Sequence, residues 1–454
     1  MKRALVLALG VALFVPTSPS GASHNADVHS DNVSLVTTWD DDGTYRSGSD
    51  IAFWGDLAVF GNLTPGGFRV MDISSPKGIH EVGQFTCVGS QSDVSIWESL
   101  VFLSVDGALA SDACDAPAAN QAQFLAGQEW EGIRIVSIAD PANPELIGNV
   151  QTDCGSHTHT LVPQLDYVDP ATGAKAPRLL VYVLSYPLTA HNQNCNPESH
   201  QKISIIEVPL ANPAAAEVIG TPSVAPSIGC HDVTYFPKRQ LAGAACITES
   251  QIWDVADPAN PKILSHIENS EINIHHSSGF AWDGNTMILG DELGGAAVAP
   301  GCGGQGDSPL GSLWFYNVRD PANPEVLSSY KIPQEDNSDL CTAHNFNVIP
   351  LRKHRDILVA AWYNGGTTIV DFTQPELPRQ LGYYIPKEGR KGTTWSSYWY
   401  NGRIYVNNYE HGSQSRGIDV FQVKHKFRKR AIDLPYLNPQ TQEPFKIPKK
   451  KKKR

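Results

Sequence analysis

Four histidines occupy equivalent positions in successive segments of the chain: His157, His231, His276 and His344. Three of these segments share a proline six residues further on: Pro163, Pro237 and Pro350. Neutral imidazoles suit Fe, Cu or Zn and leave coordination positions open for water, oxygen or substrate. The pattern therefore predicts a transition-metal centre, provided that the fold brings the four segments to one place.

Five further residues stand at the ends of the apolar segments that follow these histidines: Glu249, Asp291, Glu292, Glu410 and His411. If those segments run back antiparallel, the side chains return to the histidines. A carboxylate there accepts the free ring N–H of a ligating histidine and fixes its tautomer, or serves as a general base. We expect these five residues to surround the metal ligands.

A single histidine is more often a hydrogen-bonded structural group than a metal ligand. Four histidines in equivalent positions favour the binding of a metal or a substrate instead. His159 and His275 flank this set, and strand alternation predicts that they point away from it.

A recurring phrase identifies the elements that position these residues. It is clearest in 135–144, 252–261 and 314–324, and looser copies occupy 70–76, 206–213 and 369–375. Each copy is an alternating apolar strand that ends in a turn of Asp, Asn and Pro, where proline fixes φ and the polar side chain bonds its own backbone. Two strands precede each copy and one follows, so each unit has four strands. Units of about 45–70 residues are typical of β-propeller blades.

Seven units can be counted, and they open at Ser49, Ser92, the four histidines and Trp395. The last unit has only three strands, and the N-terminal strand at 33–38 can complete it and close the ring. We therefore predict an all-β, seven-bladed β-propeller over residues 33–423. The first strand of each blade lines the central channel, so the four histidines are expected at one height around its axis.

The strand-turn phrase resembles that of the LVIVD-repeat family of exported β-propeller proteins, over residues 49–423. This resemblance implies the fold but no single activity. The expected arrangement of four histidines also looks like that of carotenoid-cleaving oxygenases, which present four histidines to iron on a propeller axis. That likeness is one of geometry, not of sequence.

The two ends of the chain differ from its body. Residues 1–22 have the basic start, the short apolar run and the small-residue site of a signal peptide, which predicts an exported, extracytoplasmic protein without a transmembrane segment. Residues 424–454 carry a net charge of +10, and we expect a disordered basic tail that either contacts anionic surfaces or is solvated without a partner. The body between them is strongly acidic, which argues against nucleic acid as a partner.

Eight cysteines and no C-x-x-C pair predict disulfides in an exported chain. Cys230 and Cys246 are expected to face each other across the hairpin of the fourth unit. The remaining cysteines lie in loops that lead into first strands or in insertions after second strands. This placement predicts the pairs Cys87–Cys114, Cys154–Cys195 and Cys302–Cys341.

Two functions remain open at this point. The histidines favour a metal-dependent enzyme that acts on a small molecule, an oxidoreductase rather than a hydrolase. The alternative is a non-catalytic propeller, outside the cell or on its surface, that holds a protein or glycan with the long insertions at 107–131, 186–201 and 293–311. These insertions lie on the same face as the histidines.

Overall fold

The structure is a computed structural model of the chain. It describes residues 27–39, 47–75, 77–120, 122–123, 126–187, 200–293, 310–333, 341–352, 355–386, 392–410 and 417–443. The predicted signal peptide at 1–22 lies outside the described residues. Among the described residues, no helix has the length and apolar character needed to span a bilayer.

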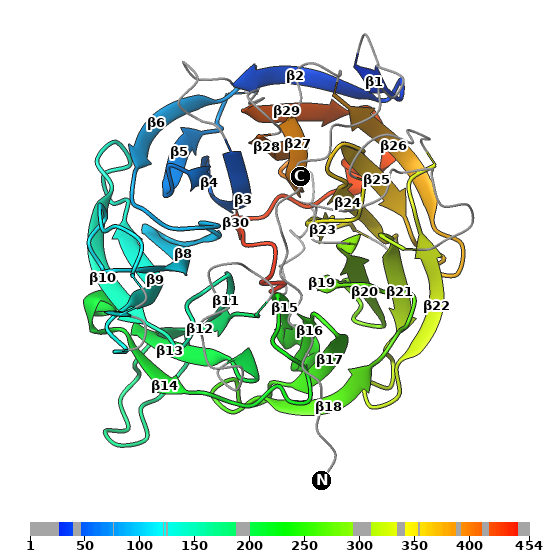
Figure 1. Cartoon of the computed structure of the whole chain (residues 1–454). Helices are drawn as coiled ribbons and strands as arrows, with labels where there is room; N and C mark the ends of the chain where they lie inside the picture. The colour runs from blue at the N-terminus through cyan, green and yellow to red at the C-terminus, as the bar shows by residue number, and fades with distance from the viewer. Residues whose placement is uncertain are drawn as a thin grey trace, which may run out of the picture.

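Seven antiparallel sheets surround a central axis, which confirms the predicted seven-bladed β-propeller (Figure 1). Blade one contains β3 (Ser47–Trp54), β4 (Leu57–Thr64), β5 (Phe68–Asp72) and β6 (His80–Phe85). Blade two contains β7 (Val94–Trp97), β8 (Leu100–Leu109), β9 (Trp130–Ser137) and β10 (Glu145–Gln151). Blade three contains β11 (Thr158–Gln164), β12 (Arg178–Leu184), β13 (Ser204–Pro209) and β14 (Glu217–Gly220).

The other four blades follow the same order from the axis outwards. Blade four contains β15 (Asp232–Phe236), β16 (Leu241–Cys246), β17 (Glu249–Asp254) and β18 (Lys262–Ile267). Blade five contains β19 (His275–Phe280), β20 (Thr286–Asp291), β21 (Leu313–Asn317) and β22 (Glu325–Tyr330). Blade six contains β23 (Phe346–Val348), β24 (Ile357–Ala361), β25 (Thr367–Asp371) and β26 (Arg379–Ile385), with β1 (Val28–His29) added at its edge. Blade seven contains β27 (Gly392–Tyr400), β28 (Arg403–Glu410), β29 (Ile418–Val423) and β2 (Val33–Trp39).

The repeated phrase forms the turn between the third and fourth strands of a blade. In blade two, Asp140 Oδ1 accepts the backbone N–H of Ala142 at 3.1 Å, and Asn143 Nδ2 donates to Asp140 Oδ2 at 2.8 Å. The same two hydrogen bonds recur at Asp257 in blade four and at Asp320 in blade five. The Asp and Asn of the phrase therefore end the strand by bonding the turn itself.

The N-terminal strand completes the last blade, as predicted. β2 pairs antiparallel with β29, from Val33 opposite Val423 to Trp39 opposite Ile418. This pairing joins the two ends of the propeller and covers a sheet edge that an open array would expose.

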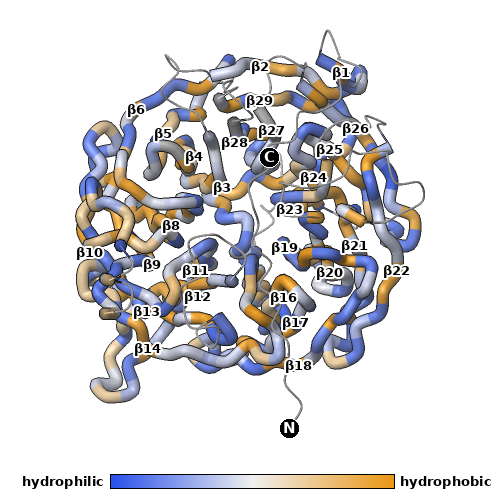
Figure 2. Tube along the Cα trace, viewed as in Figure 1, coloured by the Kyte–Doolittle hydropathy of each residue, from blue (hydrophilic) through white to orange (hydrophobic). Residues whose placement is uncertain are grey.

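The core lies mainly between neighbouring blades, where apolar side chains of facing sheets pack together. Trp253, Trp362 and Trp399 are among the largest fully buried side chains there. Hydrophobic segments run through the strands of the blades, and hydrophilic segments lie in many of the turns around the rim (Figure 2). The alternation of apolar and polar residues in the sequence thus corresponds to the strands of seven sheets arranged around the channel.

The prediction of a disordered tail is wrong for residues 424–443. The chain forms a 3-10 helix at Lys426–Arg430, and β30 (Tyr436–Leu437) then pairs with the inner edge of β3 near the centre of the ring (Figure 1). Further on, Asn438 bonds both backbone groups of Ile96 at 2.8 Å, and Tyr235 N–H donates to the Gln440 carbonyl at 2.8 Å. The segment is ordered because it satisfies backbone groups of first strands that face the channel without a neighbouring strand. The basic run from 444 to 454 lies outside the described residues.

Two of the predicted disulfides, Cys87–Cys114 and Cys230–Cys246, are present. Cys154 and Cys341 are also disulfide-bonded, while their predicted partners, Cys195 and Cys302, lie outside the described residues. The predicted hairpin register is wrong by one residue. Asp232 pairs with Ala245, which places Cys246 opposite His231 rather than opposite Cys230.

Candidate metal centre

The four histidines stand where the first strands of blades three to six begin. In three of these blades, the histidine N–H donates to the carbonyl of a residue at the end of the second strand: His157 to Leu184 at 2.8 Å, His231 to Ala245 at 2.8 Å and His344 to Ala361 at 3.0 Å. His276 sits instead in a β-bulge, between the pairs His275–Asp291 and Ser277–Gly290. A β-bulge changes the direction of a side chain, and at this bulge the His276 side chain points towards the other three histidines.

The four rings lie against one another in blade order. Ring centroids are 4.6 Å apart for His157 and His231, 3.7 Å for His231 and His276, and 4.5 Å for His276 and His344. All four side chains are buried. The structure therefore brings the predicted ligands together, and their binding of a metal stays a prediction.

Side-chain hydrogen bonds between neighbouring blades hold the starts of the first strands at one height. Each bond reaches the carbonyl of the residue that opens the next blade: Ser49 Oγ to Ser92 at 2.9 Å, Thr158 Oγ1 to His231, Ser277 Oγ to His344 at 3.2 Å, and Ser396 Oγ to Ser49 at 2.9 Å. The donors are Ser49, which opens its blade, and Thr158, Ser277 and Ser396, which each follow the opening residue of their blade. The bonds fix the backbone under the histidines before any ligand binds.

Hydrogen bonds set the tautomers of two histidines. His157 Nδ1 lies 2.6 Å from Asp106 Oδ2, and His344 Nδ1 lies 2.6 Å from the Trp395 carbonyl oxygen. Burial alone would raise the pKa of Asp106, but hydrogen bonds from His157 and neighbouring donors outweigh it and lower the pKa, so this carboxylate is ionised. Both partners are acceptors, so Nδ1 carries the hydrogen in each ring and Nε2 presents a lone pair.

One pair of ring nitrogens in the cluster has a spacing that suits either a hydrogen bond or two ligands of one metal ion. His157 Nε2 and His231 Nε2 are 3.0 Å apart. Two imidazole nitrogens at ~2.0–2.1 Å from one metal ion are about 2.9–3.4 Å apart. Among the described residues, neither nitrogen of His276 nor Nε2 of His344 has a hydrogen-bond partner. Such buried, unsatisfied groups are rare in folded proteins and call for an explanation.

Glu292 lies among the histidines rather than behind them. Its carboxylate oxygens are 3.5 Å from His276 Nε2 and 3.6 Å from His344 Nε2, and Tyr363 donates its hydroxyl to one of them. Both separations exceed a hydrogen bond. One ligand atom from each of His231, His276 and Glu292 lies within 4.8 Å of the other two. Glu292 is thus a candidate metal ligand, whereas the sequence predicts it as a hydrogen-bond partner of the ligands or as a general base.

Burial governs the protonation of the cluster. It lowers the pKa of His344 to about 3 and lowers those of His231 and His276 well below their usual value, with the neighbouring histidines adding to the effect in His231 and His276. Burial also raises the pKa of Glu292 to about 8. At neutral pH the three imidazoles are uncharged, which is the form that binds metals.

The other residues predicted around the cluster have different roles. Asp291 accepts the backbone N–H groups of Asn273, Ile274 and Gly311 and so holds loops in place. Glu249 accepts hydrogen bonds from Gln251 and His266, not from the four histidines. The side chain of Glu410 and all of His411 lie outside the described residues.

The two flanking histidines point away from the cluster, as expected. His159 contacts Ser95 Oγ at 2.6 Å and Ser104 Oγ at 2.8 Å, and His275 contacts Ser250 Oγ at 2.7 Å. Both are buried and bond serine hydroxyls of the preceding blade, while Nε2 of His275 has no hydrogen-bond partner among the described residues.

Three residues of the site were missed by the sequence analysis: Asp106, Tyr186 and Tyr363. Tyr186 Oη lies 3.1 Å from His157 Nε2, and the rings of Tyr363 and His344 pack with centroids 4.7 Å apart. Tyr186 and Tyr363 stand just beyond the ends of the second strands of blades three and six, whereas Asp106 lies within the second strand of blade two. The rule that selected Glu292 looked for carboxylates at strand ends, so it passes over two tyrosines and over Asp106, which lies inside its strand.

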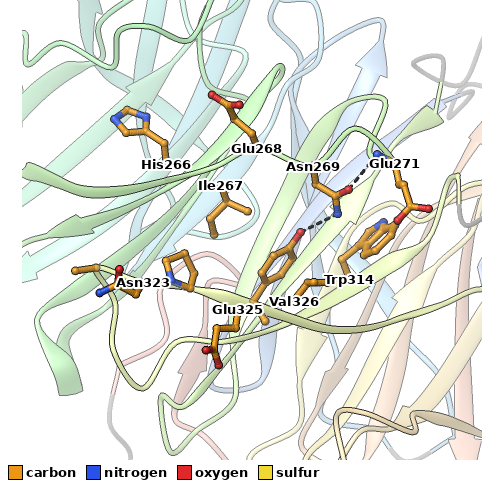
Figure 3. Close-up of a pocket in the computed structure, with 12 residues that line it drawn as sticks. His266, Ile267, Glu268, Asn269, Glu271, Trp314, Asn323, Glu325 and Val326 are labelled. Carbon is orange, nitrogen blue, oxygen red and sulfur yellow. Dashed lines mark hydrogen bonds between the residues drawn. The ribbon is translucent and has the colours of Figure 1, made fainter.

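A separate pocket of about 510 Å³ lies on the outer strands of blades four and five (Figure 3). Glu268, Glu271 and Glu325 line it, together with Trp314. The side chain of Asn269 donates to Tyr316 Oη at 2.8 Å and accepts the N–H of Glu271 at 3.0 Å, so it is engaged within the protein. This pocket shares no residue with the histidine cluster.

Comparison with known proteins gives no family. No protein-family model matches the chain, and no curated protein is similar to it. A functionally unknown protein from Desulfotomaculum acetoxidans is 10% identical, with a TM-score of 0.46 over 86% of this chain and 99% of that one. A structure named as a putative 6-phosphogluconolactonase, from Bacteroides fragilis, is 9% identical, with a TM-score of 0.47 over 88% of this chain and all of that one. Likeness at this level says nothing about activity.

Proposed function

We propose that this protein is an exported, metal-dependent oxidoreductase that binds one Fe or Cu ion through His157, His231, His276 and His344, with Glu292 as a further ligand. The observation that carries the proposal is the convergence of buried, neutral imidazole nitrogens without hydrogen-bond partners. The disulfides are consistent with an extracellular protein. From the repeat phrase we further propose membership of the LVIVD-repeat family.

A purely structural role explains the cluster poorly. A buried polar atom without a partner costs about 1–3 kcal/mol, and His276 and His344 together contain three such nitrogens. A hydrogen-bonded structural histidine has neighbours like those of His159, whose two ring nitrogens both face a serine hydroxyl. A metal ion at the centre would bind Nε2 of His344 and one nitrogen of His276, so it would satisfy two of these three nitrogens.

Two tyrosines supply protons beside the cluster. Burial raises the pKa of both Tyr186 and Tyr363 well above the usual value, so both phenols stay protonated. Tyr363 holds its proton against Glu292, and Tyr186 Oη lies 3.1 Å from His157 Nε2. If His157 Nε2 held a metal, the Tyr186 hydroxyl could donate to another group in the site. The site thus combines a set of candidate metal ligands with positioned proton donors.

The identity of the metal separates the chemical possibilities. Zn²⁺ has no redox chemistry, so a protein that selects zinc would favour hydrolysis over oxidation. Iron and copper both accept imidazole ligands and support oxygen chemistry. The metal that the protein selects can be determined by loading the purified full chain separately with Cu(II), with Zn(II) and, under anaerobic conditions, with Fe(II). The bound metal is then measured by mass spectrometry.

The test compares the wild type with a His231→Ala, His344→Ala double variant. We expect about one equivalent of iron or copper in the wild type and little in the variant. His266→Ala is the matched control, because His266 lies in blade four, like His231, but has a largely exposed side chain outside the cluster. A wild type that stays metal-free after all three loadings would refute the proposal and leave the non-catalytic binding propeller as the better reading.

A further inference from the structure

A second cavity lies at the opposite end of the channel from the histidines. It has a volume of about 520 Å³, within the range of small-molecule sites. Its walls come from the far ends of first strands, at Leu165, Trp282 and Val348, and from the C-terminal segment that crosses this mouth. From His276 to Trp282 the chain runs six residues, roughly 20 Å at the rise of a β-strand. This cavity is therefore distinct from the histidine cluster.

Most polar side chains of this cavity are engaged by the protein. Asn347 bonds the backbone N–H and carbonyl of Trp399, at 2.9 and 3.0 Å. Gln442 bonds the backbone groups of Phe280 at 2.7 and 2.9 Å, and Thr441 donates to the Leu161 carbonyl at 2.7 Å. These groups have little capacity left for a ligand.

Glu443 is the exception among the described lining residues. Its Oε2 atom is buried and has no hydrogen-bond partner in the described part of the chain. Burial raises the pKa of Glu443 to about 7, which shows how poorly its charge is solvated. A half-buried carboxylate with one oxygen that lacks a donor gains most from a ligand that brings a donor with a positive charge.

The remaining lining favours the same kind of ligand. The described lining contains no Lys or Arg, and Asp433 adds a second carboxylate at its edge. Apolar surface comes from Leu165, Leu434 and Pro435. Trp282 donates its indole N–H to the Val348 carbonyl at 3.0 Å, which fixes the ring at the wall. An aromatic ring can stabilise a nearby cation through its face.

We propose that this cavity binds a small apolar amine, with its ammonium group on the Glu443 carboxylate and its apolar body against the Leu165, Trp282 and Leu434 wall. The combination of an apolar cavity with one convergent, unpaired polar group is typical of small-molecule sites. The proposal does not depend on metal binding, so it stands or falls separately from the proposed function.

Calorimetric titration of the full chain tests it, with benzylamine as the cationic probe and benzyl alcohol as its neutral counterpart. We expect saturable binding of benzylamine and at least about tenfold weaker binding of benzyl alcohol, as for a hydrogen bond to a charged group. Glu443→Gln should weaken benzylamine binding to the level of the alcohol. Glu325→Gln, in the outer pocket of Figure 3, is the control and should leave binding unchanged.

A second variant guards against a folding defect in Glu443→Gln. Leu165 is 43% exposed, so Leu165→Lys should fold normally and block the amine by placing a cation in the cavity wall. The thermal midpoint of each variant without ligand reports its folding. Equal binding of amine and alcohol, wild-type affinity in either cavity variant, or no saturable binding of benzylamine by the wild type would each overturn the proposal.

Discussion

The substitution Asp106→Asn tests the metal centre through a residue that would not touch the metal. Asp106 Oδ1 accepts the N–H of Gln91 at 3.2 Å, while Oδ2 faces His157 Nδ1 at 2.6 Å. An asparagine that keeps its oxygen towards Gln91 turns its NH₂ group towards the imidazole. His157 Nδ1 must then accept, the ring hydrogen moves to Nε2, and the lone pair that would bind the metal is lost.

The magnitude follows from this change of tautomer. Loss of such a carboxylate partner typically weakens metal binding by about 10- to 100-fold. At a free metal concentration about 100 times the wild-type Kd, binding stabilises the wild type by ~2.7 kcal/mol. In Asp106→Asn the same metal concentration would add only about 0.4–1.4 kcal/mol, by the same relation.

Two measurements decide the outcome. Competition with a chromophoric chelator gives the metal Kd, and denaturant unfolding with and without metal gives the stabilisation. Asp93→Asn is the matched control, since Asp93 lies 3.1 Å from Nδ1 of His159, a histidine outside the cluster. If Asp106→Asn bound metal as tightly as the wild type, the assignment of the His157 tautomer would be refuted.

Three further predictions follow from the same structure. Burial raises the pKa values of Glu292 and Asp232 from their usual values of 4.5 and 3.8 to about 8. The unfolded carboxyls ionise first, so the contribution of these groups to the stability of the metal-free fold should fall as pH rises from about 4 to 8, which the difference in unfolding between the wild type and a Glu292→Gln, Asp232→Asn variant measures. Metal affinity should rise as pH approaches 8 and Glu292 loses its proton. Removing the Cys230–Cys246 disulfide by double substitution to alanine should weaken metal binding several-fold, because Cys230 adjoins His231. Removing Cys87–Cys114, which joins no blade that carries a cluster histidine, should leave metal binding unchanged. Equal effects of the two changes in the chelator competition would contradict this prediction. Asn438→Ala should cost about 1–3 kcal/mol in urea unfolding, because it leaves two buried backbone groups of Ile96 unpaired, and an unchanged midpoint would show that the C-terminal segment is not held there.

The fold could be predicted because its signal is local and repeated. Each Asp-Pro-Ala-Asn turn fixes the end of one strand through its own side chains, as at Asp140, and the repetition sets the number of blades. The prolines that follow three of the histidines gave the register needed to align the first strands. Closure by the N-terminal strand followed from a count of strands in the last unit.

The parts that escaped prediction depend on contacts between distant segments. Nothing local distinguishes residues 436–443 from a solvated tail, because their order comes from the inner edges of first strands in other blades. The place of Glu292 among the histidines depends on how far its side chain reaches across the channel. The one-residue error at Cys230 arose because the hairpin turn forms a 3-10 helix at Pro237–Arg239, which shifts the pairing by one position.

The position of the cluster within the ring determines what loss of a metal should do to the fold. The ligands come from blades three to six, whereas the ring is closed in blade seven by the pairing of β2 with β29. The blades beneath the histidines are already joined by hydrogen bonds such as that from Ser277 Oγ to the His344 carbonyl. A propeller without metal therefore keeps its closure and most of its core, unlike small zinc domains that unfold when the ion is removed. A metal bound here would add stability to a fold that already holds its ligands in place. The free energy lost by burying unpaired nitrogens is then best explained by the function of the site, because the fold itself does not need them.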